Sequence, residues 1–413
     1  MAVLFSFMTG LAQKQTPPPG GKPKDFKLSD KKKVRLPNGM NATCVQYGNV
    51  PKVSISLQIA TGGVHETAEE SGLATLVGEL LKQGSKSTDF KTLAKKVAAM
   101  GGTMNVSVGK EVIVVSGSVL SEFAPEFIAA IADLVMNPAF PASELDRLKD
   151  NMLRQLAIDM TVPQSVAENN FRKQLFGDHP FGVLFSTKEK INGLTVEKVR
   201  SFYDKNFGAR RSALYVVGNF NQNAVNAAVT KSFGGWKQGP ELYTPPVKPI
   251  VKQDTVIIDR KDAPQTTILL GLPTIDPSDK DYMGLYVVDA LLGGAFGSRI
   301  TSNIREDKGY TYSPYSSILN RKGVSVWTQT ADVTSEHTID ALLEIEKEIK
   351  RLQAEPPSEE ELKGIQSYLA GLFVLQNSSP IDLDDRSNVT VRGEAQLGKI
   401  TWPGNQTLDE FVL

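Results

Sequence analysis

Two stretches of the chain share one order of hydrophobic patterns. In the first, the β-rich run EVIVVSGSVL begins at Glu111, and an amphipathic helix, a short turn with proline and a second helix opening at Ser143 follow it. In the second, GVSVWTQTADV begins near Gly323 and the same elements follow, with Ser358 opening the last helix. Both serines precede acidic residues, which favours an N-cap at each. The two copies lie about two hundred residues apart, so the repeat predicts two domains of related design.

A strand and then an apolar helix are expected ahead of each copy. In the first half these are Val53–Ala60 and Gly72–Leu81, and in the second half they are Thr266–Leu272 and Tyr282–Leu292. Each domain is therefore expected to be α+β, a mostly antiparallel sheet with helices packed on one face.

The first half carries further elements that the second half lacks. A helix at Leu194–Phe207, which Thr195 caps, precedes a strand at Leu214–Val217 and a helix near Asn223–Lys231. We therefore expect the second domain to be C-terminally incomplete, as a shortened form or as a domain that another chain completes. Its sheet should have fewer strands, with a vacated edge near Thr266–Leu272 or Gly323–Thr330.

Breaks in the pattern give the domain boundaries. Residues 1–29 form a signal-like apolar segment and a proline-rich spacer, and residues 239–252, with four prolines, form a linker. The first domain is then residues 30–238 and the second is residues 253–413. The signal-like start lacks the usual basic residues but favours a periplasmic or secreted protein, with a cytoplasmic location as the alternative. It is too short to span a bilayer.

Charge and cysteine content exclude several classes of function. The chain has 46 Lys and Arg against 46 Asp and Glu, which gives no reason to expect nucleic acid or an anionic membrane as partner. The single cysteine, Cys44, excludes an internal disulfide. It lies in the alternating stretch Asn41–Tyr47, typical of a half-buried strand thiol.

Local motifs for catalysis are scarce. The three histidines, His65, His179 and His337, are too far apart to form a local metal site. No nucleophile elbow, phosphate loop or dinucleotide fingerprint is present. His65 has acidic neighbours in HETAEE, but an exposed loop before a helix explains that segment better than a metal site does. The GGAFGS segment joins two helical segments, so we expect a tight turn there rather than a phosphate site.

The segment TGGVHETAEESGLATLVGELLKQGSKS, which begins at Thr61, resembles the opening helix of the insulinase/pitrilysin family of zinc peptidases. In active members the helix after Gly-Leu-Ala carries His-x-x-Glu-His, whose histidines bind zinc and whose glutamate activates water. The matching residues here are Thr75, Gly78 and Glu79, and the family's third ligand position matches Gln155. The resemblance therefore implies a degenerate zinc domain, with no metal or cofactor in this chain and zinc expected in a partner subunit.

The resemblance continues through DHPFG (Asp178–Gly182) into the second half. There LLGGAFGSRITSNIREDKGYTYS contains Gly-Ser-Arg and then Arg305, Glu306, Gly309 and Tyr312. In two-chain members of the family this Arg/Tyr pair belongs to the subunit without zinc and reaches toward the partner's zinc. A guanidinium and a phenol can donate hydrogen bonds to the oxygen of a scissile carbonyl. A solvated helix end at Arg305 and a core position for Tyr312 are the alternative reading.

The sequence and its resemblance lead to one hypothesis and two alternatives. The chain is expected to be the non-catalytic subunit of a heterodimeric zinc peptidase that degrades unfolded peptides. It would supply Arg305, Tyr312 and part of the substrate chamber. The edge strand around Asn105–Val115 would guide substrate by strand addition, with Asn105 in contact with peptide. The alternatives are a purely structural core-type subunit of a larger complex, and an autonomous enzyme that uses His65 or Glu79.

Overall fold

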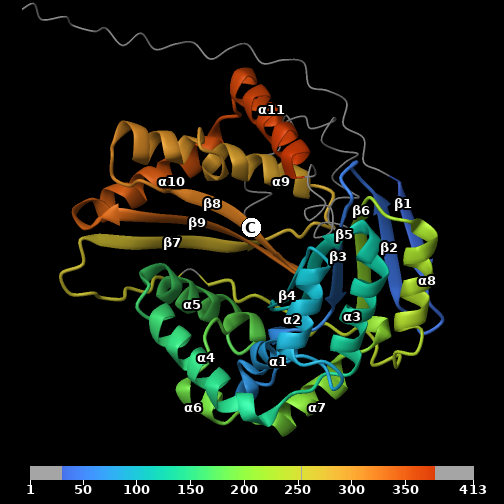
Figure 1. The fold of residues 1–413 in the computed structure, drawn as a ribbon. Helices are drawn as coiled ribbons and strands as arrows, with labels where there is room; N and C mark the ends of the chain where they lie inside the picture. Colours follow the sequence, from blue (N-terminus) through green and yellow to red (C-terminus); the bar gives the residue numbers. More distant parts are fainter. Residues whose placement is uncertain (1–29, 253, 377–413) are drawn as a thin grey trace, which may run out of the picture.

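The computed structural model describes residues 30–252 and 254–376, which form two α+β domains (Figure 1). The first domain contains a sheet of β1 (Lys31–Arg35), β2 (Asn41–Gln46), β3 (Lys52–Ile59), β4 (Thr103–Val108), β5 (Ile113–Leu120) and β6 (Ser212–Gly218). Its helices are α1 (Leu73–Leu81), α2 (Phe90–Ala99), α3 (Ala124–Met136), α4 (Leu145–Asp159), α5 (Pro163–Phe176), α6 (Lys188–Asn192), α7 (Val196–Asn206) and α8 (Gln222–Phe233).

The second domain is smaller in its described part. It contains β7 (Gln265–Thr274), β8 (Tyr315–Arg321), β9 (Val324–Thr334), α9 (Tyr282–Asp289), α10 (Thr338–Ala354) and α11 (Glu359–Gln376). Two π-helical segments, Ala290–Gly294 and Thr301–Asp307, lie between α9 and β8. The stretch between them is a turn, as the sequence predicted for GGAFGS. No helix of residues 30–252 and 254–376 is long and apolar enough to cross a membrane.

The sheet of the first domain has the order β1-β2-β6-β3-β5-β4. All neighbours are antiparallel except β2 and β6, which run parallel, so the sheet is mixed. The expectation of a mostly antiparallel sheet is confirmed. The parallel pair was not foreseen, because β6 joins the sheet beside β2 only after a long helical crossover. The apolar core lies between the sheet and helices that include α1, α3, α7 and α8.

The sheet of the second domain has the order β7-β9-β8 and is antiparallel throughout. This repeats the order β3-β5-β4, with α9 in the place of α1 and α10 in the place of α3. Among the described residues the second sheet has three strands against six. The prediction that this domain is C-terminally incomplete concerns residues 377–413, which lie outside the described residues. In the part of the chain that the structure describes, β7 lies at an edge of this sheet, and the vacated edge expected near Thr266–Leu272 stays a prediction for the whole domain. The alternative edge near Gly323–Thr330 is wrong, because that stretch forms the central strand β9.

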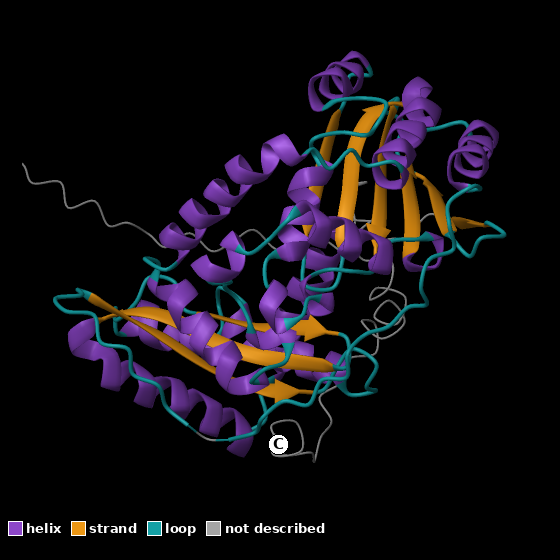
Figure 2. Cartoon of the chain, turned by 90° about the horizontal axis from the view of Figure 1, so that it is seen from below, coloured by secondary structure: helices purple, strands orange, loops and turns teal. Residues whose placement is uncertain are grey.

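The two faces of the second sheet have different covers. Ile268 packs with Ala341 and Ile345 of α10 in one apolar cluster. Successive strand residues point to opposite faces, so Gly271 faces the other way, and a Cβ there would lie 2.6 Å from the ring of Phe171 on α5. The helices of this domain therefore cover one face, and α5 of the first domain covers the other. Figure 1 shows α5 below β7 and α10 above it, and Figure 2 shows the two sheets from a second direction.

Two of the three predicted helix caps form, and the single cysteine is more buried than predicted. Thr195 accepts a hydrogen bond from the Lys198 amide, and Ser358 accepts one from the Glu361 amide, as predicted. Ser143 is not an N-cap, because a 3-10 turn at Ala142–Glu144 precedes α4 and leaves the serine inside the helical path. Cys44 lies on a strand, but it is buried rather than half-buried, and this burial raises the pKa of its thiol.

Candidate functional site

Helix α1 carries three of the four positions that the resemblance matches to the family's zinc site. The helix follows Gly72, whose φ of 97° is in the left-handed region, where glycine costs least. The Glu66 carboxylate accepts a hydrogen bond of 2.7 Å from the Ala74 amide in the first turn of the helix. Burial raises the pKa of Glu66. The acidic turn HETAEE thus caps α1, a structural role that the sequence analysis did not identify.

Gly78, which the resemblance matches to the family's catalytic base, lies against β4, the outer strand of the sheet in the described residues. A Cβ at Gly78 would lie 2.2 Å from Cγ2 of Val108, far inside van der Waals contact. Val108 therefore occupies the space that any side chain at position 78 would need. A glutamate does not fit there unless β4 or Val108 moves.

The remaining positions offer a weak donor set. Thr75 is exposed, and the Glu79 carboxylate is paired with the Lys82 ammonium at 2.6 Å. The amide of Gln155 on α4 donates a hydrogen bond of 2.8 Å to Asp159 of the same helix. No group of three or more His, Cys, Asp or Glu in the described part of the chain is arranged to hold a metal ion. These positions do not fit the histidine-based zinc site of the family.

His65 also lacks the surroundings of a metal ligand. Its Nε2 lies 2.9 Å from the carbonyl oxygen of Tyr243, an acceptor, so the ring donates its proton there. Burial lowers the pKa of His65. The residue fastens the start of the linker to the first domain.

Arg305 and Tyr312 are brought together in the second domain, as the resemblance implied. Arg305 lies near the end of the π-helical segment Thr301–Asp307, and its guanidinium carbon is 4.7 Å from the centre of the Tyr312 ring. Tyr312 is 77% exposed, so the alternative of a core tyrosine is wrong. Its hydroxyl is available to a ligand, while its ring fixes the cation by a cation–π contact.

A third residue completes this cluster. The guanidinium carbon of Arg305 is also 4.5 Å from the centre of the Phe296 ring, and Phe296 is 69% exposed. The Nε of Arg305 pairs with the Glu306 carboxylate at 3.1 Å. The sequence analysis identified the glycine-rich turn but not the role of Phe296. The sequence feature that could have indicated this role is an aromatic residue beside the glycines of that turn.

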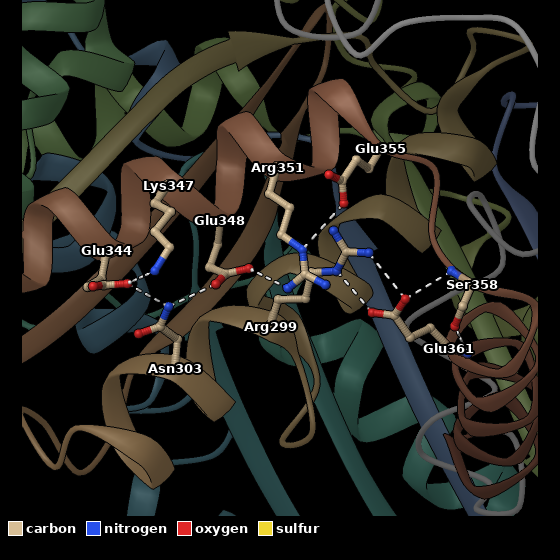
Figure 3. A network of polar contacts seen from close by, with 9 residues as sticks. All are labelled: Arg299, Asn303, Glu344, Lys347, Glu348, Arg351, Glu355, Ser358 and Glu361. Atoms are coloured by element: carbon tan, nitrogen blue, oxygen red, sulfur yellow. Dashed lines mark hydrogen bonds and ion pairs between the residues drawn. The ribbon is translucent and has the colours of Figure 1, made fainter.

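The segment that carries Arg305 is held by polar contacts from two helices (Figure 3). Arg299, a largely buried residue, makes a bidentate pair with Glu361 of α11 at 3.0 and 3.2 Å. The amide nitrogen of Asn303 donates to Glu344 and Glu348 of α10, each at 2.8 Å. Ser298 and Arg299 of the Gly-Ser-Arg part are therefore buried and hold the segment in position, whereas Gly297 is exposed.

Asn105 lies on β4, the outer strand of the first sheet. It pairs in register with Ser116 of β5 and is exposed. In the described residues no strand lies on the other side of β4. Only the first part of the expected edge, around Asn105, is at the edge, because β5 at Ile113–Leu120 is paired on both sides.

The chain matches two family models of one peptidase family. Residues 44–184 match the model described as insulinase (peptidase family M16), and residues 193–369 match the peptidase M16 inactive domain. The first match includes Thr75, Gly78 and Glu79, and the second includes Arg305 and Tyr312.

Relatives in several bacteria are named uncharacterized zinc proteases. A protein of Mycobacterium leprae is 27% identical over 69% of this chain and 65% of its own length. The protease YmxG of Bacillus subtilis is 23% identical over 92% of this chain and 91% of its own length.

Solved structures share the fold. A peptidase M16 inactive domain from Pseudomonas fluorescens has a TM-score of 0.82 at 22% identity, covering 90% of this chain and 92% of its own. A protease from Helicobacter pylori has a TM-score of 0.83 at 19% identity, covering 91% and 94%. The periplasmic protease PqqL from Escherichia coli has a TM-score of 0.77 at 16% identity, covering 94% of this chain and 46% of its own. The chain is therefore a homologue of the insulinase, or M16, family of peptidases, with an M16 N-terminal domain followed by an inactive C-terminal domain.

Proposed function

We propose that this chain is the non-catalytic subunit of a two-chain zinc peptidase and that it presents Arg305 and Tyr312 to a zinc-bearing homologous subunit. One contrast between its domains supports this most. In the first domain Val108 fills the place of the catalytic base. In the second domain the Arg/Tyr pair is assembled, with the tyrosine 77% exposed.

The pair suits the chemistry of peptide hydrolysis. Attack on a peptide carbonyl places negative charge on its oxygen, and donors fixed before the reaction stabilise that charge. A guanidinium offers hydrogen-bond donors in a fixed planar geometry, and contacts with Phe296 and Tyr312 restrict that of Arg305. The Tyr312 hydroxyl would supply a second hydrogen bond to the same oxygen.

The substrates would be unfolded peptides in the periplasm. An extended peptide can add to the free edge of β4, where Asn105 would contact it. A closed chamber between two subunits would admit flexible chains only. The signal-like first residues and the likeness to a periplasmic protease support this location.

The proposal is tested by mixing the purified chain with a zinc-bearing M16 homologue from the same genome. Peptidase activity should appear on mixing, with no activity and no stoichiometric zinc in this chain alone. Tyr312→Phe and Arg305→Ala should each lower turnover by roughly ten- to a thousandfold, the usual range for loss of one oxyanion donor. Tyr315→Phe is the matched control, because Tyr315 is also exposed, at 55%, but lies outside the pair.

Two outcomes would contradict the proposal. Full turnover of both variants in a complex shown to be intact would remove the catalytic role and favour a purely structural subunit. About one zinc per isolated chain, with activity lost on chelation, would show that the chain is itself a peptidase.

A further inference from the structure

One side chain of the first domain reaches a carboxylate of the second sheet. The amide of Gln164, in the first turn of α5, donates a hydrogen bond of 2.7 Å to one carboxylate oxygen of Asp332 on β9. The other oxygen of Asp332 accepts a hydrogen bond of 2.6 Å from the hydroxyl of Thr267, which lies opposite it on β7. Both oxygens of this carboxylate are therefore engaged, one within the second domain and one across the domain boundary.

Asp332 lies on the face of the second sheet that α5 covers (Figure 1). Alternate residues of a strand share a face, so Thr267 faces the same way as Gly271, where a Cβ would meet the ring of Phe171 on α5. Because Asp332 is directly opposite Thr267 in the antiparallel pair, its side chain points to that face as well. The contact with Gln164 therefore fixes the start of α5 to the sheet, about two turns before the ring of Phe171.

The main chain of Asp332 holds the segment that precedes Tyr312. The Thr311 hydroxyl donates a hydrogen bond of 2.7 Å to the Asp332 carbonyl oxygen, and Thr311 is buried. Thr311 also forms an isolated antiparallel bridge with Val333, the next residue of β9. The end of β9 thus fixes the backbone directly before Tyr312.

Tyr310 joins this segment to Arg305. The carbonyl oxygen of Tyr310 accepts a hydrogen bond of 3.1 Å from the Thr334 amide, at the end of β9. Its amide donates a hydrogen bond of 2.9 Å to the carbonyl oxygen of Ile304, which precedes Arg305. Both members of the Arg/Tyr pair are therefore attached to the same end of β9.

We propose that Gln164 and Asp332 are positioning residues for Tyr312. Their contact ties the end of β9, and with it the backbone beside Tyr312, to α5 of the first domain. The inference rests on the proposed function, in which the Tyr312 hydroxyl donates a hydrogen bond to a peptide oxygen. Such a donor stabilises the developing charge best when its direction is fixed before the reaction. The first domain would then influence catalysis through the orientation of Tyr312.

The alternative is a contact that only joins the two domains. The buried cluster that includes Phe176, Phe181 and Val326 joins them independently of Gln164. Loss of one exposed hydrogen bond should therefore leave the domains associated, because such a bond contributes only about 1 kcal/mol. An effect on the segment before Tyr312 can then be separated from an effect on domain association.

Substitutions that break and restore the contact can be made at both residues. Gln164→Glu places a second carboxylate beside Asp332, and the like charges should break the contact. Addition of Asp332→Asn should restore it, because the asparagine amide can donate to the new carboxylate while its oxygen still accepts from Thr267. Asp332→Asn alone should keep the contact, since two amides can pair. Gln238→Glu is the matched control, because Gln238 is an exposed glutamine outside α5.

Hydrogen exchange of the isolated full chain measures the order of the segment. The Thr334 amide, which donates to Tyr310, should exchange roughly three- to tenfold faster in Gln164→Glu, the change expected from one lost hydrogen bond. In the double variant and in the control, its exchange should match that of the wild type.

Turnover in the mixture with the zinc-bearing homologue measures the effect on Tyr312. Gln164→Glu should lower kcat by roughly three- to tenfold with KM unchanged, because orientation of the donor matters in the transition state. In a chain that already carries Tyr312→Phe, Gln164→Glu should lower kcat no further, since the hydroxyl that it orients is absent.

Four results would overturn the inference. They are unchanged exchange of the Thr334 amide in Gln164→Glu, equal effects of Gln164→Glu and Gln238→Glu, no recovery in the double variant, and multiplicative losses of kcat by Gln164→Glu and Tyr312→Phe. Absence of peptidase activity on mixing would contradict the proposed function instead. The exchange of the isolated chain would then still decide whether the contact orders the backbone beside Tyr312.

Discussion

At the scale of single residues, the surroundings of Gly78 bear on the proposed loss of the family's zinc site. The space beside α1 is filled from another element, because Val108 of β4 comes within 2.2 Å of where a Cβ would be. Reintroducing a histidine or glutamate motif on α1 would therefore require changes in β4 as well. If Gly78 takes the place of the catalytic base, as we propose, the glycine there and the close packing of α1 on β4 go together.

This packing can be measured with glycine-to-alanine variants. Gly78→Ala should lower the free energy of unfolding by about 1–3 kcal/mol, because overpacking outweighs the gain of up to about 1 kcal/mol in helix propensity. Gly364→Ala is the matched control, since Gly364 is exposed on α11 with nothing within 4 Å of a Cβ, and it should stabilise. Urea denaturation of both variants, and of the double variant Gly78→Ala with Val108→Ala, measures whether each substitution raises or lowers the free energy of unfolding. Stabilisation by Gly78→Ala would show that Val108 moves freely.

Side-chain contacts could be predicted from the sequence where the two residues are close along the chain. Ser358 and the amide of Glu361 lie three residues apart, so the cap was visible in the sequence. The contact of Phe296 with Arg305 depends on how a turn folds back on a π-helical segment, which no spacing encodes. The same holds for Val108 and Gly78, whose contact depends on the position of an edge strand.

At the scale of elements, the segment with Arg305 owes its position to charged side chains from α10 and α11. Glu361 accepts two hydrogen bonds from Arg299, and this contact lowers the pKa of Glu361 to about 2. Glu344 accepts a hydrogen bond from Asn303, which, with nearby lysines, lowers its pKa to about 2. Both carboxylates thus favour the folded second domain while they are ionised.

A pH dependence of stability follows from these shifts. The folded pKa of Glu361 lies below the unfolded value near 4.5, so its contribution is complete above pH 4.5 and is lost as pH falls toward 2. Glu361→Gln should therefore lower the free energy of unfolding by about 1–2 kcal/mol at pH 7, a value reduced for the partial exposure of the carboxylate. At pH 2.5 the same substitution should change the free energy of unfolding little. Glu359→Gln is the matched control, with an exposed carboxylate on the same helix turn. Thermal unfolding across pH 2.5–7 tests this, and parallel profiles for wild type and Glu361→Gln would contradict it.

The order of elements was predictable and part of their assembly was not. The repeat predicted strand, helix and strand in both halves because hydrophobic periodicity is a local signal. The parallel pairing of β2 with β6 joins residues such as Ala42 and Leu214, far apart in the sequence, and no local pattern specifies it. Chain order alone also did not show that Gly323–Thr330 would lie in the middle of its sheet.

At the scale of the whole molecule, the two domains share an apolar interface. Val64, Phe176 and Phe181 of the first domain pack with Val324 and Val326 of the second in one buried cluster. At its border the guanidinium of Arg321 lies over the ring of Phe181 and 3.8 Å from the Glu111 carboxylate. The motif DHPFG, identified from its family resemblance, thus contributes an anchor between domains.

The last prediction concerns the coupling of the two domains through Phe181. Phe181 is 1% exposed, and its truncation leaves a cavity between elements of both domains. Phe181→Ala should lower the free energy of unfolding by about 3–5 kcal/mol. It should also separate one unfolding transition into two, because the smaller domain loses part of its apolar contact with the first domain. Phe90→Ala is the matched control, since Phe90 on α2 is 54% exposed, and it should change stability by less than about 1 kcal/mol with one transition kept. Urea unfolding followed by circular dichroism, with limited proteolysis of residues 239–252, measures both effects. A single transition and an unchanged rate of linker cleavage in Phe181→Ala would show that the domains are held together elsewhere, by the contact of α5 with β7.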